Sequence, residues 1–223
     1  MKRTLCATFF LSCVSICTAF GGSITVGTDG GGNSFPFGGP SSGALGTRYQ
    51  EAYASSDFSG TITITGIDFF VEGAVSTESL YVATYTLSLS TISANINSLS
   101  DSNFNSNLGP DNTVFDTVAL SGTAPTTLTF TGGPYTYNPA NGNLLLDIQL
   151  NGGGGSAAST GAAFEDGDGS ATGTARYHNF GSATTGFGLV TEFDFGTSTV
   201  PEPGTLSLLA FGLVGLLARR LRA

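Results

Sequence analysis

Short runs of alternating polar and apolar residues fill the middle of the chain. Residues 61–65 read Thr-Ile-Thr-Ile-Thr, and every second position from Tyr81 to Leu89 is apolar. A period of two places the apolar side chains on one face of a half-buried β-strand. No long stretch between residues 21 and 199 repeats its apolar residues every 3.6 positions, as an amphipathic helix requires. The pattern therefore predicts strands and not helices.

Turn-forming residues separate these runs, and Asn141-Gly142 is a strong signal for a hairpin turn. The remaining strand candidates are residues 67–71, 114–120, 128–130, 144–150, 171–177 and 189–195. About eight to ten strands at this spacing predict an all-β fold, an antiparallel β-sandwich or jelly roll. The Gly-rich segments 27–46 and 151–161 are predicted loops, and the polar segment 92–108 is expected to hold one short helical turn.

The N-terminal segment has the features of a secretory signal peptide. Lys2 and Arg3 precede the uncharged apolar stretch 5–19, which ends in small residues. This arrangement predicts that the Sec machinery exports the chain and that signal peptidase removes residues 1–19 by cutting after Ala19. An uncleaved anchor helix is the alternative, but the stretch is short for a membrane span of about 20 residues.

All three cysteines lie inside that segment, at positions 6, 13 and 17. A lipoprotein would require a cut before Cys13 or Cys17, and Phe10 and Ile16 make both sites poor. Residues 20–196, the predicted β-sandwich ectodomain, have no cysteine. This body can therefore form no disulfide and no thiolate metal site, and its stability has to come from a packed core.

The C-terminal segment combines a proline-flanked acid, a short apolar stretch and a basic end. The proline motif is Val200, Pro201, Glu202 and Pro203, and the basic cluster is Arg219, Arg220 and Arg222. The apolar stretch 204–218 gives a predicted transmembrane helix of about 22 Å, which spans a bilayer core of about 30 Å only if the arginines snorkel. Residues 219–223 should stay cytoplasmic as a basic tail, with the body outside. The prolines keep the linker 197–203 extended, which is the geometry that a protease requires.

This order of elements resembles the PEP-CTERM sorting signal of Gram-negative bacteria. The resemblance implies that an exosortase, a membrane-embedded enzyme similar to cysteine transpeptidases, recognises Pro201, Glu202 and Pro203. Cutting there would release the protein or transfer it to the cell surface, in hosts that usually make extracellular polysaccharide. The tail is also similar to a segment labelled as the C-terminal region of ice-binding proteins, a label that does not imply ice binding. A plain membrane tail with a proline linker is the alternative.

The body also resembles an ectodomain that recurs in PEP-CTERM proteins, although this resemblance implies no activity. The segments that carry it are 32–38, 48–53, 58–60, 85–90 and 141–147.

Charge is scarce and almost entirely acidic in the body. Charged residues make up 10% of the chain, against about 25% in ordinary soluble domains. Between residues 20 and 200, Arg48 and Arg176 are the only basic residues, against 15 acidic ones, so the net charge is 2 − 15 = −13. Such a surface repels phosphate backbones and excludes nucleic-acid partners.

Few residues suggest catalysis. His178 is the only histidine, so a site with two histidine ligands is impossible, and no Gly-x-Ser-x-Gly elbow accompanies it. Paired carboxylates could hydrolyse glycosides, but no spacing selects a pair. In the segment 165–170, Asp166 and Asp168 alternate with glycine, a pattern that suits calcium, although a solvated acidic turn is the more ordinary interpretation. Calcium is the one cofactor that the sequence suggests.

These observations predict a non-enzymatic, exported surface or extracellular-matrix protein that is first anchored in the inner membrane, then processed by exosortase, and associated with exopolysaccharide or biofilm. A carbohydrate-binding or glycoside-acting β-sandwich is the alternative. In that case exposed tyrosines could stack on sugar rings, although they could equally belong to the core. The candidates are Tyr49, Tyr53, Tyr81, Tyr135 and Tyr137.

Overall fold

The computed structural model describes six segments of the chain. They are residues 21–39, 47–73, 77–152, 161–170, 173–178 and 184–196. The predicted signal peptide, proline motif, transmembrane helix and basic tail lie outside them. Within these segments no helix is long and apolar enough to cross a membrane.

The described chain is all-β, as the alternating pattern predicts. The strands are β1 (Gly21–Val26), β2 (Gly31–Asn33), β3 (Arg48–Tyr53), β4 (Ile62–Phe70), β5 (Ala83–Ile92), β6 (Thr113–Leu120), β7 (Thr127–Tyr137), β8 (Asn143–Asn151), β9 (Phe164–Asp166), β10 (Thr174–His178), β11 (Thr184–Thr185) and β12 (Thr191–Gly196). Four short 3₁₀ helices connect some of them: η1 (Ser55–Asp57), η2 (Ile96–Ser98), η3 (Phe104–Asn107) and η4 (Pro139–Asn141). The single helical turn expected in residues 92–108 is therefore two separate turns, η2 and η3.

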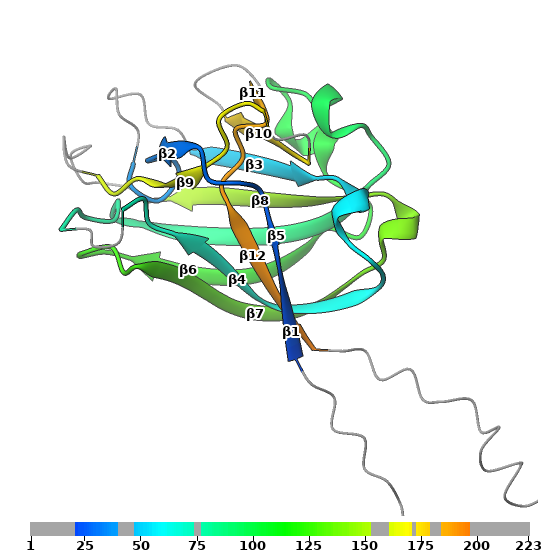
Figure 1. Cartoon of the computed structure of the whole chain (residues 1–223), viewed down its shortest axis with the longest axis horizontal. Helices are drawn as coiled ribbons and strands as arrows, with labels where there is room; N and C mark the ends of the chain where they lie inside the picture. Colours follow the sequence, from blue (N-terminus) through cyan, green and yellow to red (C-terminus); the bar gives the residue numbers. More distant parts are fainter. Residues whose placement is uncertain are drawn as a thin grey trace, which may run out of the picture.

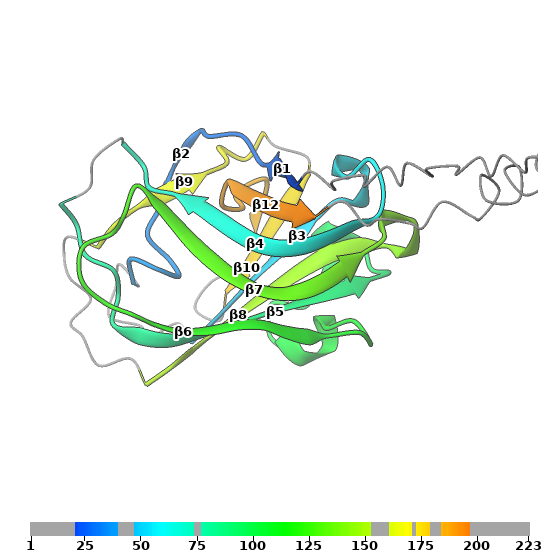
Figure 2. The ribbon, with the colours of Figure 1, turned by 90° about the horizontal axis from the view of Figure 1, so that it is seen from below.

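Two antiparallel sheets form the two layers of the molecule (Figure 1). The four-stranded sheet has the order β1-β12-β4-β7, and the six-stranded sheet has the order β11-β10-β3-β8-β5-β6. Strands β2 and β9 pair in a small third sheet. Figure 2 shows the two larger sheets edge on, with the core between them. Ile67 and Phe69 of β4 face this core from one side, and Tyr85 and Leu87 of β5 face it from the other.

An aromatic cluster fills the centre of this core. Phe37 is fully buried, and its ring lies 4.8 Å from Phe69, 5.3 Å from Phe130 and 5.5 Å from Tyr85, centroid to centroid. Such aromatic pairs stabilise a core beyond their buried area. The Gly-rich segment that contributes Phe37 is thereby anchored to the core and is not a free loop along its whole length.

A second apolar cluster lies on the opposite face of the six-stranded sheet. Ile96 and Phe104, from η2 and η3, pack there against Leu145 of β8 and Tyr177 of β10. The segment that contains η2 and η3 therefore covers this outer face, so β8 is buried on both sides. This explains why Leu144 to Ile148 are all buried instead of alternating.

Candidate functional site

The two ends of the described chain lie side by side. Strand β1 pairs antiparallel with β12, and Gly21 is opposite Gly196. On its other edge β12 pairs with β4, where Gly196 is opposite Thr63. Figures 1 and 2 show β1 and β12 running together to the same edge of the molecule. The segments that carry the predicted export and sorting signals are therefore attached at neighbouring points of the fold.

A recess of about 510 Å³, which we call the terminal recess, lies at this edge. It is lined by Gly21, Gly22, Ser23, Thr65, Asp194, Phe195 and Gly196. A Cβ atom at position 22 would lie 3.2 Å from the ring of Phe195, so a side chain there would require this ring to shift slightly. Around Gly196 the space is more open, since a Cβ atom at that position would have no neighbour within 4 Å.

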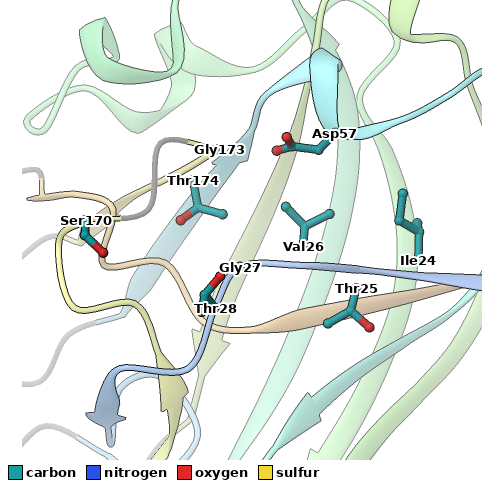
Figure 3. Close-up of a pocket in the computed structure, with 9 residues that line it drawn as sticks. All are labelled: Ile24, Thr25, Val26, Gly27, Thr28, Asp57, Ser170, Gly173 and Thr174. Atoms are coloured by element: carbon teal, nitrogen blue, oxygen red, sulfur yellow. The ribbon is translucent and has the colours of Figure 1, made fainter.

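A second hollow, of about 490 Å³, lies between β1, η1 and the start of β10 (Figure 3). We call it the β1 pocket, and it is lined by Ile24, Thr25, Val26, Gly27, Thr28, Asp57, Ser170, Gly173 and Thr174. The carboxylate of Asp57 projects towards Gly173, whose added Cβ would lie 2.2 Å from Oδ2. Within the described structure, the Asp57 Oδ2 and Thr174 Oγ1 atoms are buried without a hydrogen-bond partner.

Glu51 lies behind Thr174 and is fully buried. Its Oε2 accepts hydrogen bonds from the Tyr49 hydroxyl at 2.7 Å and from the Leu189 amide at 3.0 Å. Its Oε1 has no hydrogen-bond partner among the described residues, and an added Cβ at Gly188 would lie 2.2 Å from it. Burial raises the pKa of Glu51 to about 8. The carboxyl is therefore largely protonated at neutral pH, which is how the core tolerates it without a cation.

The β1 pocket has the chemistry of a receptor for hydrogen-bond donors. Its unpartnered acceptors are Asp57 Oδ2 and Thr174 Oγ1, and Ile24 and Val26 give it an apolar wall. Its size is in the range of about 300–1,000 Å³ found for small-molecule sites. Because both oxygen atoms are buried, a ligand in the pocket would reach them only if the residues around them shifted.

His178, the only histidine, lies away from this pocket. It lines a recess of about 360 Å³ together with Arg176, Asn33 and Phe35. Burial, followed by the charge of Arg176, lowers the pKa of the imidazole. His178 is therefore neutral at physiological pH, and its ring packs edge-on against Phe35 at 6.3 Å.

The tyrosines proposed to stack on sugar rings belong to the core, so the idea that they are exposed is wrong. The exposed fraction is 0% for Tyr49, Tyr53 and Tyr137, and 6% for Tyr81 and Tyr135. In a chain without tryptophan, these large side chains provide much of the core volume. None of the five rings is available for stacking.

The structure places the two candidate calcium ligands in different surroundings. Asp166 is buried and pairs with Arg176, with Oδ2 and Nη1 2.8 Å apart. Asp168 is exposed, and its Oδ1 accepts hydrogen bonds from the amide of Ser170, at 2.8 Å, and from the hydroxyl of the same residue. Each carboxylate therefore has protein partners of its own, and calcium binding at this loop stays a prediction.

Three other carboxylates do converge, on the outer face of the four-stranded sheet. Asp68, Glu192 and Asp194, which we call the acidic triad, offer oxygen atoms that all lie within 4.8 Å of one another. Strand register brings them together, because Glu192 is opposite Asp68 across β12 and β4. Alternation along β12 already places Glu192 and Asp194 on one face, whereas Asp68 comes from a strand that is remote in sequence. Hard cations such as calcium prefer oxygen ligands of this kind.

The chain carries a known sorting motif at its C-terminus. The family model described as the PEP-CTERM protein-sorting motif matches residues 199–223. Among curated proteins and solved structures, none matches the chain significantly. The motif starts three residues after β12, and it indicates an exported protein that is anchored in the membrane, processed by exosortase and delivered to the surface.

Proposed function

We propose that the chain is the precursor of a non-catalytic surface or extracellular-matrix protein. Signal peptidase removes residues 1–19, the helix 204–218 anchors the precursor, and the basic cluster after it stays cytoplasmic. Exosortase then cuts near Pro201-Glu202-Pro203 and frees the body for the matrix, where it associates with exopolysaccharide. The observation that carries this proposal is the PEP-CTERM match at residues 199–223, directly after the last strand of the folded body.

The folded body has properties that suit a protein located outside the cell. Its stability rests on the packed core between the two sheets, because residues 20–196 contain no cysteine. Its net charge of −13 between residues 20 and 200 favours solubility and disfavours self-association. These properties support a role as a robust matrix component, for which neither a cofactor nor a reactive group is needed.

Mass spectrometry of the mature protein, isolated from a host that encodes exosortase, tests the proposal. We expect an N-terminus at Phe20 and a C-terminus near residue 200. Replacing Pro201-Glu202-Pro203 with three alanines should leave the intact tail on the protein, as should deletion of exosortase. An exported pool that keeps Arg222 in the wild type, and that does not change when exosortase is deleted, would support the plain membrane anchor instead.

The β1 pocket favours a second candidate function, binding of a carbohydrate. Asp57 and Thr174, which line it, carry a carboxylate and a hydroxyl that can exchange hydrogen bonds with the hydroxyls of a sugar. A glycan array probed with the mature protein, with a hydrolysis assay on each hit, tests this candidate and separates binding from glycoside cleavage. Asp57→Asn should abolish any hit, whereas Asp101→Asn, which changes an exposed acid elsewhere, should not. A hit that survives Asp57→Asn would place the glycan at another site.

A further inference from the structure

Strand β12 is held on both edges as far as its last residue. It has six register pairs with β1, from Val26–Thr191 to Gly21–Gly196. Its other edge pairs with β4 up to Gly196 opposite Thr63. Its side chain Phe193 is fully buried in the core. Drawing this strand into another protein would break two hydrogen-bonded ladders and expose that ring, so Gly196 is a fixed point of the fold.

The chain between this fixed point and the sorting motif is short. Pro201 follows Gly196 by five residues, and an extended chain of five residues spans at most about 16–18 Å. An enzyme that acts on residues 201–203 must therefore approach the end of β12 to within that distance. The predicted signal-peptidase cut after Ala19 lies just as close, because β1 begins at Gly21.

The surface at this edge lacks the charge of the rest of the body. The ends of the four strands of the sheet, residues 21–24, 62–65, 134–137 and 195–196, contain no charged side chain. Asp194 is the one charged residue that lines the terminal recess among the described residues. The strand ends themselves therefore exert little of the repulsion that the −13 body would otherwise exert on anionic groups, whereas Asp194 of the acidic triad adds one negative charge inside the recess.

From the anchored strand, the short connection and the hollow beside them, we propose that the terminal recess is the surface on which the membrane-embedded processing enzyme docks while it acts on residues 201–203. This inference rests on the proposed function and adds a second contact on the substrate, inside the folded body. The fold then limits how far Pro201-Glu202-Pro203 can lie from the end of β12. This tripeptide alone therefore does not define the substrate of the enzyme.

The length of the connection gives the first test, performed on the full-length precursor in cells that contain exosortase. Deleting residues 197–198, which lie outside the matched motif, shortens the reach by about 7 Å. We expect the processing rate to fall about ten-fold or more, because a linker that cannot span two sites lowers their effective concentration towards zero. An insertion of six Gly/Ser residues after residue 198 should restore processing of the shortened chain.

Filling the recess gives the second test. Gly196→Trp adds a large ring beside the recess at a position where a Cβ atom has no neighbour within 4 Å, and it should slow processing about as strongly as the deletion. The matched control is Val114→Trp, at an exposed position on β6 of the other sheet, which should be processed at the wild-type rate. Thermal melting of each variant should show an intact fold.

The outcomes separate the two proposals. If the triple-alanine variant of residues 201–203 is processed normally, the proposed function is wrong. If that variant is blocked while the deletion and Gly196→Trp are both processed at the wild-type rate, the docking surface is overturned and the sorting function stands. Equal slowing of Gly196→Trp and Val114→Trp would also overturn it, because the effect would then not depend on the recess.

Discussion

The two sheets of the sandwich differ in what covers their outer faces. On the six-stranded sheet, η2 and η3 cover a buried polar network in which Arg48 pairs with Asp147 at 2.7 Å. On the four-stranded sheet, the acidic triad stands half-buried with no arginine near it. The body has only two arginines between residues 20 and 200, and each pairs with a buried aspartate.

This contrast shows how a body with only two arginines accommodates its acidic side chains. Asp147 and Asp166, both buried, are neutralised by Arg48 and Arg176. Glu51 is also fully buried, and burial raises its pKa more than the charge of Arg176 lowers it, so Glu51 is tolerated as the neutral acid. The remaining acids are exposed or half-buried, although Asp57 and Asp68 each have one buried oxygen without a hydrogen-bond partner among the described residues. Each of these three solutions can be tested by one substitution.

The largest effect on stability is expected from Arg48→Met, on the face of the six-stranded sheet that η2 and η3 cover. The change leaves Asp147, which is 1% exposed, with only Gln50 and Gln149 as side-chain partners. Breaking a buried pair in this way destabilises a fold by about 3–5 kcal/mol, and urea unfolding of the mature protein measures it. The double variant Arg48→Met/Asp147→Asn should recover part of the loss. A double variant that is no more stable than the single one would mean that packing of the arginine, and not charge, is what matters.

The second effect is a dependence of stability on pH that Glu51 creates. Its pKa rises from 4.5 in the unfolded chain to about 8 in the fold, so between these values the folded state binds more protons. Stability should therefore fall as the pH rises through this window, by at most about 1.4 kcal/mol per pH unit. Glu51→Gln should remove this slope, as measured by urea unfolding at pH 6 and pH 7.

Glu78→Gln is the matched control, since Glu78 is only half-buried, and it should keep the wild-type slope. An equal slope in wild type and Glu51→Gln would show that Glu51 is ionised in the fold, and a partner for its Oε1 would then have to be found.

Much of the fold could be predicted from the sequence, because a strand with one buried face alternates apolar and polar residues. Alternation identified β4 and most of β5, and the apolar run 144–150 identified β8. Phe37 stands out in its Gly-rich segment as a candidate anchor, although the composition of the segment indicates a loop. Its burial depends on contacts with rings such as Phe69 and Phe130, which lie far along the chain, and local patterns do not contain that information.

The candidate sites depended even more on contacts between distant residues. The sorting motif is continuous in sequence and could be recognised directly. The acidic triad and the β1 pocket arise only after strand register is set, as when Glu192 is placed opposite Asp68. The segment RYQEAY of β3 shows the same limit. Its Gln50 and Glu51 are polar yet fully buried, because the network on one face and the Tyr49 hydroxyl on the other satisfy them.

A third prediction tests how firmly η2 and η3 cover their sheet. The Tyr177 hydroxyl donates to the carbonyl of Ile96 and accepts from the amide of Leu99 at 3.3 Å. Tyr177→Phe removes both hydrogen bonds and should cost about 1 kcal/mol, with faster amide hydrogen exchange between residues 96 and 108. Tyr85→Phe, which removes two hydrogen bonds in the main core, should destabilise without this local effect. Unchanged exchange in Tyr177→Phe would show that apolar packing alone holds the cover.

The smallest effect on stability is expected on the outer face of the four-stranded sheet, which carries the acidic triad. Burial, followed by the charges of Asp68 and Glu192, raises the pKa of Asp194, so the carboxylates of the triad repel one another when all are ionised. Asp194→Asn should therefore stabilise the fold by about 0.2–0.5 kcal/mol at low salt, the range of exposed charge pairs. The gain should shrink as salt approaches 1 M, where the screening length is about 3 Å. Thermal melting over a salt series measures this difference.

The same melting series, repeated with millimolar Ca²⁺ and with EDTA, distinguishes the two acidic surfaces as ion sites. If calcium binds the triad, Asp194→Asn should abolish the stabilisation by Ca²⁺. If it binds the loop predicted from the sequence, Asp166→Ala and Asp168→Ala should abolish it instead, while Asp194→Asn keeps it. Identical melting curves of the wild type in Ca²⁺ and in EDTA would show that calcium binds neither surface, so that no bound ion reduces the repulsion within the triad. The stabilisation by Asp194→Asn would then measure that repulsion alone.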